Sequence, residues 1–371
     1  MKKVAISIGD INGVGLEIAL GAHKIISKII KPIYFVDFGV VECASKILKY
    51  DIPKDFEIYE IAPFCSAKLR ESIANNTLIR PANATKESGE YSFVSFKRAV
   101  ECVEKGAMDA ILTLPINKFA WKMAGIEYLG HTEFLRAYFA RNGANLNANG
   151  GVGKSVDFGD SSDFSAKKSV GKSADSSDFS AKKSVDFGDS NADSSDLGKN
   201  AIMMLGCEEM FVALFTDHIP LNAVPTRIEF NALYEFLLHF HTHFSFESAL
   251  VLGLNPHAGD GGILGSEDKI IQDALNAANK RLGADIYKGV VAPDSAFRAQ
   301  NRAKFKVFVA MYHDQGLSVL KALYADKSIN VTLGIPILRV SVEHGTGFDV
   351  AYKGVARTES YIEAVKFIAN H

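Results

Sequence analysis

VFVAMYHDQGLSVLKALYADKSINVTLGIPILRVSVEHGTGFDV, residues 307–350, is the stretch that decides the fold of this chain. Its first five residues form an apolar run, which is typical of a strand buried within a parallel sheet. The polar residues 312–315 follow at once, and residues 316–324 have the spacing of a helix. Open α/β sheets bind ligands at the carboxyl ends of their strands, so this strand end predicts a ligand site.

Polar and charged residues also surround a second apolar run, residues 330–333. Asn330 and Arg339 flank a segment that should be buried, and a buried charge is costly unless it has a partner. We therefore infer a bound anion. Lys321 and Thr132 are candidates for the rest of a phosphate and carboxylate pocket, with arginine binding in bidentate geometry and lysine as a point charge. For any single basic residue, the alternative is a solvated surface position.

Outward from this stretch, apolar runs of strand length alternate with segments of helical spacing. Strands are expected at residues 4–8, 32–38, 55–61, 110–114, 201–205, 211–215, 248–254 and 289–292. Helices are expected from about residue 16 and at residues 41–50, 90–106, 223–240, 267–281 and 359–370. This alternation predicts an α/β fold with a largely parallel sheet.

The composition excludes several classes of protein. A formal net charge of -2 leaves no basic excess to neutralise a nucleic acid. No apolar stretch reaches the ~18–20 residues of a membrane span, and the first ten residues lack the apolar run of a signal peptide. The four cysteines are scattered without a CxxC pair, which favours free thiols in a reducing compartment. We expect a cytoplasmic protein.

Residues 142–200 differ in kind from the rest of the 371-residue chain. They are rich in Ser, Asp, Gly and Lys and contain internal copies: KSVDFGDS at 154–161 and 183–190, and SSDFSAKKSV at 161–170 and 176–185. Such a composition cannot bury enough apolar surface to offset the entropy of ordering. We predict a disordered low-complexity insertion within a single unit that spans residues 1–371.

Three histidines, His218, His257 and His313, each follow an apolar strand. Imidazole is a common ligand of zinc and related metals, and three protein ligands with an open position are typical of a catalytic site. The alternative for each is a hydrogen-bonding residue at a strand end. Asp294 and Asp314 are candidate metal ligands, partners of a metal-bound histidine or proton acceptors, and the alternative is a turn cap. The denser cluster of histidines at 239, 241 and 243 lies at a helix end, where surface or packing roles are expected.

Two further motifs leave alternatives open. The loop GDINGVG, residues 9–15, joins a strand to a helix, where backbone N–H groups can approach an anion. Its spacing is neither GxGxxG nor that of a Walker loop, so a tight turn is an equal alternative. His131, in GHTEFL at residues 130–135, is a candidate for ligand binding, with helix capping or packing as the alternative.

Taken together, the motifs resemble those of the 4-hydroxythreonine-4-phosphate dehydrogenase family of pyridoxal phosphate biosynthesis. The motifs that carry the resemblance are SIGDINGVGLEIAL (7–20), LPINK (114–118), AGIEYLGHTEFL (124–135), LFTDHIPL (214–221), GLNPHAGDGG (253–262), APDSAF (292–297), AMYHDQGLSVLK (310–321) and INVTLGIPILRVSVEHGTGFDVA (329–351). One departure is Ile11, where the family usually has a proline. The low-complexity insertion is a second departure.

The resemblance implies a fold similar to isopropylmalate and isocitrate dehydrogenases. Two α/β subdomains would surround a mostly parallel sheet, with the active site in the cleft between them. It also implies a homodimer with the active site at the subunit interface, and NAD or NADP bound without a Rossmann motif. The implied metal ligands are His218, His257 and His313. The implied substrate-binding residues are His131, Thr132, Lys321, Asn330 and Arg339, with Asp294 close to the metal and the substrate.

The reaction implied by the resemblance is oxidation of 4-(phosphooxy)-L-threonine to 2-amino-3-oxo-4-(phosphonooxy)butanoate, which decarboxylates to 3-amino-2-oxopropyl phosphate. A divalent metal (Zn, Mg or Co) would lower the pKa of the substrate hydroxyl while the nicotinamide takes the hydride. Lys321, or an aspartate such as Asp294 acting through water, is the candidate base. The alternatives are a sibling dehydrogenase of threonate or erythronate 4-phosphate, a phosphate acyltransferase-like enzyme and an inactive binding protein.

Overall fold

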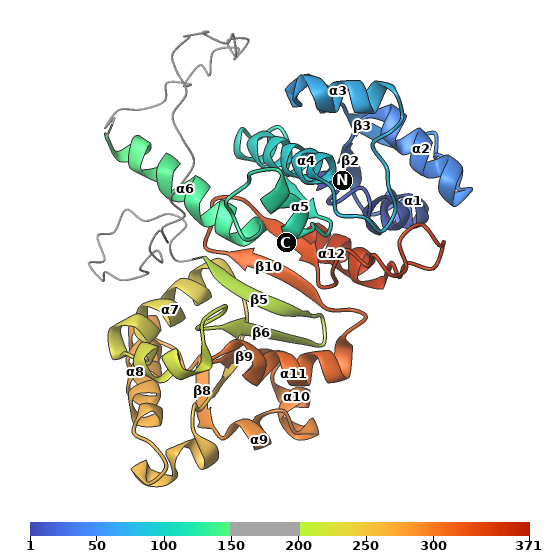
Figure 1. Ribbon diagram of the computed structural model, residues 1–371. Helices are drawn as coiled ribbons and strands as arrows, with labels where there is room; N and C mark the ends of the chain where they lie inside the picture. Colours follow the sequence, from blue (N-terminus) through green and yellow to red (C-terminus); the bar gives the residue numbers. More distant parts are fainter. Residues whose placement is uncertain (149–200) are drawn as a thin grey trace, which may run out of the picture.

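The computed structural model describes residues 1–148 and 201–371, and the described strands form one 11-stranded sheet (Figure 1). The strand order is β3-β2-β1-β4-β11-β10-β5-β6-β9-β7-β8. Neighbouring strands are parallel except in the pairs β11–β10, β10–β5 and β5–β6. The strands are β1 (Lys3–Ser7), β2 (Lys31–Phe35), β3 (Glu57–Tyr59), β4 (Ala110–Thr113), β5 (Ile202–Cys207), β6 (Met210–Leu214), β7 (Ala249–Leu252), β8 (Tyr287–Val291), β9 (Val307–Ala310), β10 (Ile329–Leu333) and β11 (Arg339–Val342). The predicted α/β class with a mostly parallel sheet is confirmed.

The helices gather around the two ends of this sheet. Figure 1 shows α1–α5 and α12 near β1–β4, and α7–α11 near β6–β9. The α-helices are α1 (Gly15–Ile26), α2 (Phe38–Leu48), α3 (Ala67–Ala74), α4 (Lys86–Glu104), α5 (Lys118–Met123), α6 (His131–Ala148), α7 (Phe230–His243), α8 (Glu267–Leu282), α9 (Pro293–Ala296), α10 (Ala299–Lys304), α11 (His313–Tyr324) and α12 (Glu359–Asn370). Short 3₁₀ helices are η1 (Ala62–Phe64), η2 (Leu221–Ala223), η3 (Pro225–Arg227) and η4 (Pro256–Gly262).

Local sequence explains where several helices begin and end. Thr85 caps α4 in a reciprocal capping box with Ser88, which satisfies two N–H groups that the helix leaves without partners. Helix α8 has acidic residues in its first turn and basic residues in its last, complementing the helix dipole. It ends at Gly283, whose φ of 68° is the left-handed conformation that glycine adopts readily.

Two apolar clusters form the core. The larger one joins strands and helices over most of the chain and includes the fully buried Trp121, Tyr34 and Phe96. The smaller one lies between Phe308 and Val212 of the sheet and Leu317 and Leu320 of α11. Packing of α11 against the sheet therefore determines the position of the residues at the start of that helix.

The structure corrects several predicted boundaries. Helix α7 begins at Phe230 instead of residue 223, since the segment that contains Pro225 forms 3₁₀ turns. Helix α11 begins at His313 instead of residue 316, and strand β11 was not predicted. Helix α6 continues to Ala148, so residues 142–148 of the predicted insertion have helical backbone. The rest of that insertion, residues 149–200, lies outside the described residues.

Candidate functional site

A row of polar side chains crosses four adjacent strands on one face of the sheet. Ser7 of β1 pairs with Thr113 of β4, which pairs with Ser341 of β11. Ser341 in turn pairs with Asn330 of β10. Ser7, Thr113 and Ser341 are buried and Asn330 is half-buried. Burying a polar side chain is costly unless it is hydrogen-bonded, and apolar residues would fill this place without that cost. Four hydrogen-bonding side chains in register inside a sheet therefore indicate a place where polar chemistry is required.

Arg339, on β11, extends over this face and is only 3% exposed. Its Nη1 donates to Thr332 Oγ1 at 3.0 Å, and its Nη2 donates to Thr113 Oγ1 at 2.9 Å. No carboxylate of the described residues accepts a hydrogen bond from it. Burial lowers the pKa of Arg339 to about 10, with the negative charge of Glu343 opposing. Arg339 is therefore a buried cation that donates hydrogen bonds only to neutral groups.

His131, the first residue of α6, lies against this guanidinium. Its Nδ1 is 3.3 Å from Arg339 Nη2, and its ring packs against Phe96 and Trp121, with ring centroids 4.4 and 5.6 Å away. Burial, and the nearby charge of Arg339, hold the pKa of His131 well below its usual value. The imidazole is therefore neutral. Thr132 follows in the same helical turn and is half-buried.

Three buried polar atoms around Arg339 have no hydrogen-bond partner among the described residues. They are Arg339 Nε, His131 Nε2 and Asn330 Oδ1. Buried polar atoms are nearly always hydrogen-bonded, so a cluster of unpaired ones indicates a missing polar ligand. Arg339 Nε is a free donor beside a buried positive charge, which fits an anion, whereas Asn330 Oδ1 is an acceptor and would take a donor of the ligand, such as a hydroxyl or an ammonium group.

Lys321 of α11 lies beside the end of β11. Its Nζ forms an ion pair with Glu343 Oε1 at 2.9 Å; the lysine side chain is 48% exposed and the glutamate 12%. Burial raises the pKa of Glu343, while the charges of Lys321, His313 and Arg339 lower it. Glu343 thus lies within electrostatic reach of three residues predicted to belong to the site. Glu343 was not itself predicted to be a site residue. The signal that could have identified it is an acidic residue among the basic residues of the stretch 307–350.

The three histidines predicted to bind a metal are only partly brought together. The rings of His218 and His313 have centroids 5.6 Å apart, and His313 Nδ1 is 2.7 Å from Asp314 Oδ1. Burial lowers the pKa of His218, and the neighbouring Asp217 opposes that shift. Within residues 1–148 and 201–371, no three His, Cys, Asp or Glu side chains lie close enough together to hold a metal. The pair fits part of a metal site, and the third ligand is not in place.

His257 belongs to an exposed loop, η4, in which residues 257–261 have positive φ angles. The base of this loop is held by Asp268, which accepts hydrogen bonds from the N–H groups of Leu254 at 2.8 Å and Asn255 at 3.2 Å. Gln315 connects the ends of β7 and β9, since its amide nitrogen donates to Gly253 O at 2.7 Å and its Oε1 accepts the N–H of Met311 at 2.7 Å. Asp268 was not predicted, because nothing in the local sequence distinguishes it, and Gln315 was expected only as one of the polar residues that follow β9.

Asp294 lies on α9 and is exposed, without a hydrogen-bond or ion-pair partner in the described part of the chain. The histidine cluster at residues 239–243 ends α7, with the rings of His239 and His243 4.1 Å apart. His243 is exposed, and His239 and His241 are half-buried, in agreement with the predicted surface or packing role.

In the glycine loop after β1, residues 9–15, the backbone N–H groups of residues 10 and 12–14 donate hydrogen bonds to other atoms of the chain. Asp10 N–H donates to Pro115 O at 2.8 Å and Val14 N–H donates to Thr346 O at 2.9 Å. The N–H groups of Asn12 and Gly13 donate to Asp10. Because these four N–H groups have partners in the chain, the tight-turn interpretation is favoured over an anion-binding loop. The loop also joins the carboxyl ends of β1, β4 and β11.

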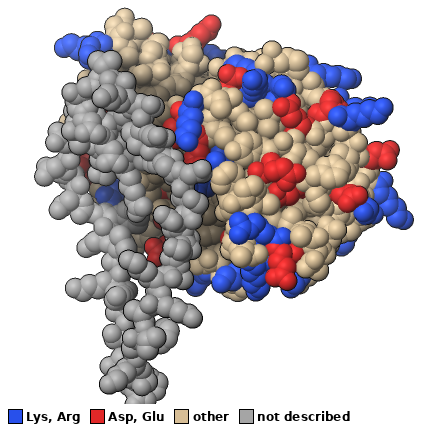
Figure 2. Space-filling model, turned by 90° about the horizontal axis from the view of Figure 1, so that it is seen from above, with Lys and Arg blue, Asp and Glu red and all other residues tan. Residues whose placement is uncertain are grey.

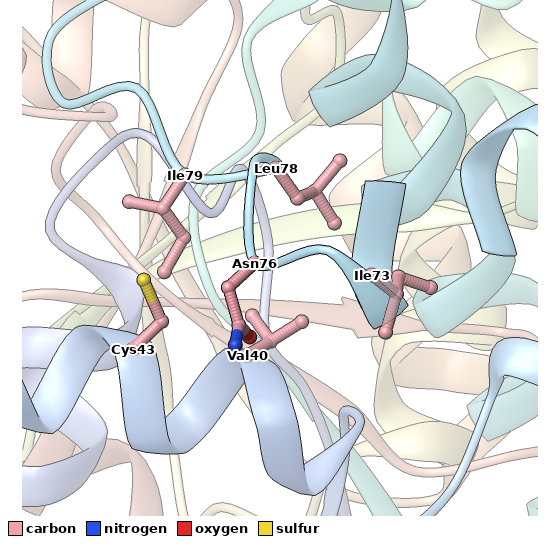
Figure 3. Close-up of a pocket in the computed structure, with 6 residues that line it drawn as sticks. All are labelled: Val40, Cys43, Ile73, Asn76, Leu78 and Ile79. Atoms are coloured by element: carbon pink, nitrogen blue, oxygen red, sulfur yellow. The ribbon is translucent and has the colours of Figure 1, made fainter. Parts of the chain in front are cut away.

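A separate small pocket lies between α2 and α3. Figure 3 shows Val40 and Cys43 of α2 facing the segment that follows α3. Its lining is Val40, Cys43, Ile73, Asn76, Leu78 and Ile79, and it leaves no room for a molecule the size of water. It is a packing gap and supplies no binding site.

The charged surface agrees with the low net charge. Figure 2 shows basic and acidic side chains interspersed over the uncovered part of one face, without a continuous basic stripe there. None of the described helices has the length and apolar character needed to cross a membrane.

Comparison with known proteins identifies the family. The family model for the pyridoxal phosphate biosynthetic protein PdxA matches residues 28–149 and 181–368. The chain belongs to the PdxA family. The resemblance found in the sequence motifs is therefore confirmed, as is the expectation of a dehydrogenase of pyridoxine biosynthesis.

Relatives named 4-hydroxythreonine-4-phosphate dehydrogenase span nearly the whole chain. The protein of Campylobacter fetus subsp. fetus is 42% identical over 368 residues, covering 99% of this chain and 97% of the relative. That of Sulfurimonas denitrificans is 40% identical over 364 residues, covering 98% and 96%. The crystal structure of the Burkholderia phymatum enzyme of the same name is 25% identical, with a TM-score of 0.65 over 100% of this chain and 98% of that one.

Proposed function

We propose that this PdxA-family chain oxidises 4-(phosphooxy)-L-threonine to 2-amino-3-oxo-4-(phosphonooxy)butanoate, using NAD or NADP. The product is a β-keto acid, and its decarboxylation gives 3-amino-2-oxopropyl phosphate. The observation that carries the proposal is the buried pair of Arg339 and His131, whose unpaired nitrogens Nε and Nε2 suit a phosphate group, with the unpaired Oδ1 of Asn330 left for a donor elsewhere on the substrate. Relatives at up to 42% identity that are named for this activity support it.

The substrate would be bound through Arg339, His131, Thr132 and Asn330, with its phosphate on Arg339 and His131. A dianion placed there would neutralise the buried guanidinium and satisfy the free Nε of Arg339. Because Arg339 and His131 lie in contact and each has an unpaired nitrogen, both could bind the same phosphate, which would position the rest of the substrate for reaction.

Lys321 and Asp294 are the candidates for proton transfer. The Nζ of Lys321 is held by Glu343 at 2.9 Å while its side chain stays 48% exposed, so it would first bind a negatively charged part of the substrate. It could accept a proton only after losing one. Asp294 is exposed and has no competing partner among the described residues, which leaves its carboxylate available to act through water.

We further propose that His218, His257 and His313 bind a divalent metal, namely zinc, magnesium or cobalt. The proximity of His218 and His313 supports this assignment, and His257 would have to join them through movement of its loop. When bound, the metal would polarise the substrate hydroxyl, and the nicotinamide would accept the hydride. A homodimer with the active site at the subunit interface and a cytoplasmic location complete the proposal.

The test is cofactor reduction by the full chain with 4-(phosphooxy)-L-threonine, with NAD and NADP in parallel. The protein is stripped of metal and assayed with and without added Zn²⁺, Mg²⁺ or Co²⁺, alongside His257→Ala. Metal-dependent reduction that His257→Ala abolishes is the expected result. Reduction with threonate 4-phosphate but not with the amino-acid substrate would assign the sibling activity. Absence of reduction with both substrates would refute the proposal.

A further inference from the structure

Thr113 and Thr332 hold Arg339 from both sides. Strand β11, which carries Arg339, lies between β4 and β10, and each neighbour contributes one threonine. Thr113 receives a hydrogen bond from Nη2 at 2.9 Å, and Thr332 receives one from Nη1 at 3.0 Å. Thr113 is fully buried and Thr332 is 2% exposed, so water does not compete for these bonds. Bonds to both hydroxyls, one from each terminal nitrogen, orient the guanidinium.

The chemistry of these partners is suited to a binding site. A hydroxyl accepts a hydrogen bond from arginine without cancelling its charge, whereas a carboxylate in the same place would neutralise it. The buried charge of Arg339 therefore remains available for an anionic ligand. The two threonines orient the residue that binds and do not themselves need to contact the ligand.

The contact between Arg339 and His131 determines which ring nitrogen of the histidine carries hydrogen. A guanidinium has N–H donors and no acceptor. The ring nitrogen that faces it at 3.3 Å, Nδ1, must therefore be the unprotonated acceptor. A neutral imidazole has one hydrogen, so that hydrogen lies on Nε2. Nε2 is also the buried atom that lacks a partner among the described residues.

We propose that Thr113 and Thr332 are positioning residues for Arg339, and that Arg339 in turn fixes His131 as a neutral Nε2–H hydrogen-bond donor to the substrate phosphate. The inference rests on the proposed function and specifies it further. His131 acts neither as a cation nor as a general base, because Nδ1 is occupied by Arg339 and Nε2 already carries hydrogen. Phe96 and Trp121 hold the ring in this orientation.

The histidine assignment is tested with two amides that imitate different ring nitrogens. In His131→Gln the amide nitrogen can occupy the position of the Nε2 donor, whereas in His131→Asn the amide oxygen can replace the Nδ1 acceptor and no donor remains at the position of Nε2. Binding of inorganic phosphate and of 4-(phosphooxy)-L-threonine to the full chain is measured by calorimetry without cofactor, so that no turnover occurs. We expect the Asn variant to bind both roughly 10-fold or more weakly than the Gln variant, because a buried bond to a charged group is lost. Equal affinities, or weaker binding by the Gln variant, would overturn the assignment.

The positioning role is tested with Thr113→Val and Thr332→Val, which keep side-chain shape and remove the hydroxyl. Each is expected to weaken phosphate binding by about 10-fold, and the serine variant at the same position is expected to restore most of it. Thr216→Val is the matched control, because Thr216 is a buried threonine whose hydroxyl donates to Met311 O and takes no part in holding Arg339. Loss of thermal stability without loss of phosphate affinity in the Val variants would refute the positioning role.

The outcomes separate this inference from the proposed function. A chain that oxidises the substrate but binds phosphate equally well with Gln and Asn at position 131 refutes the inference alone. A chain that shows the expected order of affinities but oxidises nothing refutes the proposed reaction alone. A wild-type chain that binds neither phosphate nor the substrate refutes both.

Discussion

Asp10, in the glycine loop, offers a prediction whose size follows from the structure. Its side chain is fully buried, and burial raises its pKa from 3.8 to about 6, with hydrogen bonds from Asn12 and Ser88 opposing. Each pKa unit corresponds to about 1.4 kcal/mol, so ionised Asp10 reduces the stability of the fold by about 3 kcal/mol. We predict that Asp10→Asn stabilises the protein at neutral pH by up to about this amount.

The local hydrogen bonds allow this substitution. The amide oxygen can still accept the N–H of Asn12, which lies 2.9 Å from Asp10 Oδ1. The amide nitrogen can donate to the Ser88 hydroxyl, which can keep its own bond to Thr85 O. No polar atom of this group then loses its partner, so removal of the buried charge is the main energetic change.

The pH dependence has a definite sign. Below pH 3.8, Asp10 is protonated in both the folded and the unfolded chain and contributes no difference. Between pH 3.8 and about 6 the folded state binds more protons, so the stability of the wild type falls as pH rises, and it levels off above that window. The advantage of Asp10→Asn should therefore be near zero at the lower limit and greatest above the upper one.

The assay is urea unfolding of both proteins across this pH range, followed by circular dichroism. Equal slopes of unfolding free energy against urea would indicate that the two proteins unfold with the same exposure of surface. A variant that is less stable than the wild type at neutral pH, or a difference that does not change with pH, would refute the reasoning.

Three other predictions follow from close contacts and buried charges. Gly9→Ala should destabilise the fold by roughly 3 kcal/mol, because φ is 70° and a Cβ would overlap the carbonyl of Pro115. Gly125→Ala is the control: its φ is 81° but the space around it is open, so it should cost only about 1 kcal/mol in urea unfolding. Glu343→Gln should raise the substrate KM roughly tenfold by releasing Lys321, with rescue by Glu343→Asp; an unchanged KM would contradict it. Asp268→Asn should weaken Zn²⁺ binding in calorimetry roughly tenfold by loosening the loop of His257, and unchanged affinity would exclude that role.

Continuous apolar runs made most of the sheet predictable. A strand buried on both faces, such as β9 or β7, is apolar at every position, and that pattern is visible without neighbours. Strand β11 was missed because it begins with Arg339 and alternates polar and apolar residues over only four positions. Its identity as a strand depends on β4 and β10, which pair with it on either side.

For the site, the sequence determined which residues carry unusual chemistry. Arg339 and Asn330 were identified because they interrupt a segment that should be buried, and the family was identified from several motifs in their characteristic order. Such signals are local, since they depend on a residue and its neighbours along the chain. The grouping of residues at strand ends is also predictable in part, because parallel strands place their carboxyl ends at one edge.

Only the tertiary structure decided how these residues act on one another. Thr113 and His131 lie 226 and 208 positions from Arg339, yet they hold its guanidinium and receive its hydrogen bonds. The structure likewise decided that Glu343 pairs with Lys321 and that the three histidines are only partly grouped among the described residues. A hydroxyl or a carboxylate has no sequence pattern that reveals its partner. Its orientation, its burial and its pKa are determined by atoms that folding brings from distant parts of the chain.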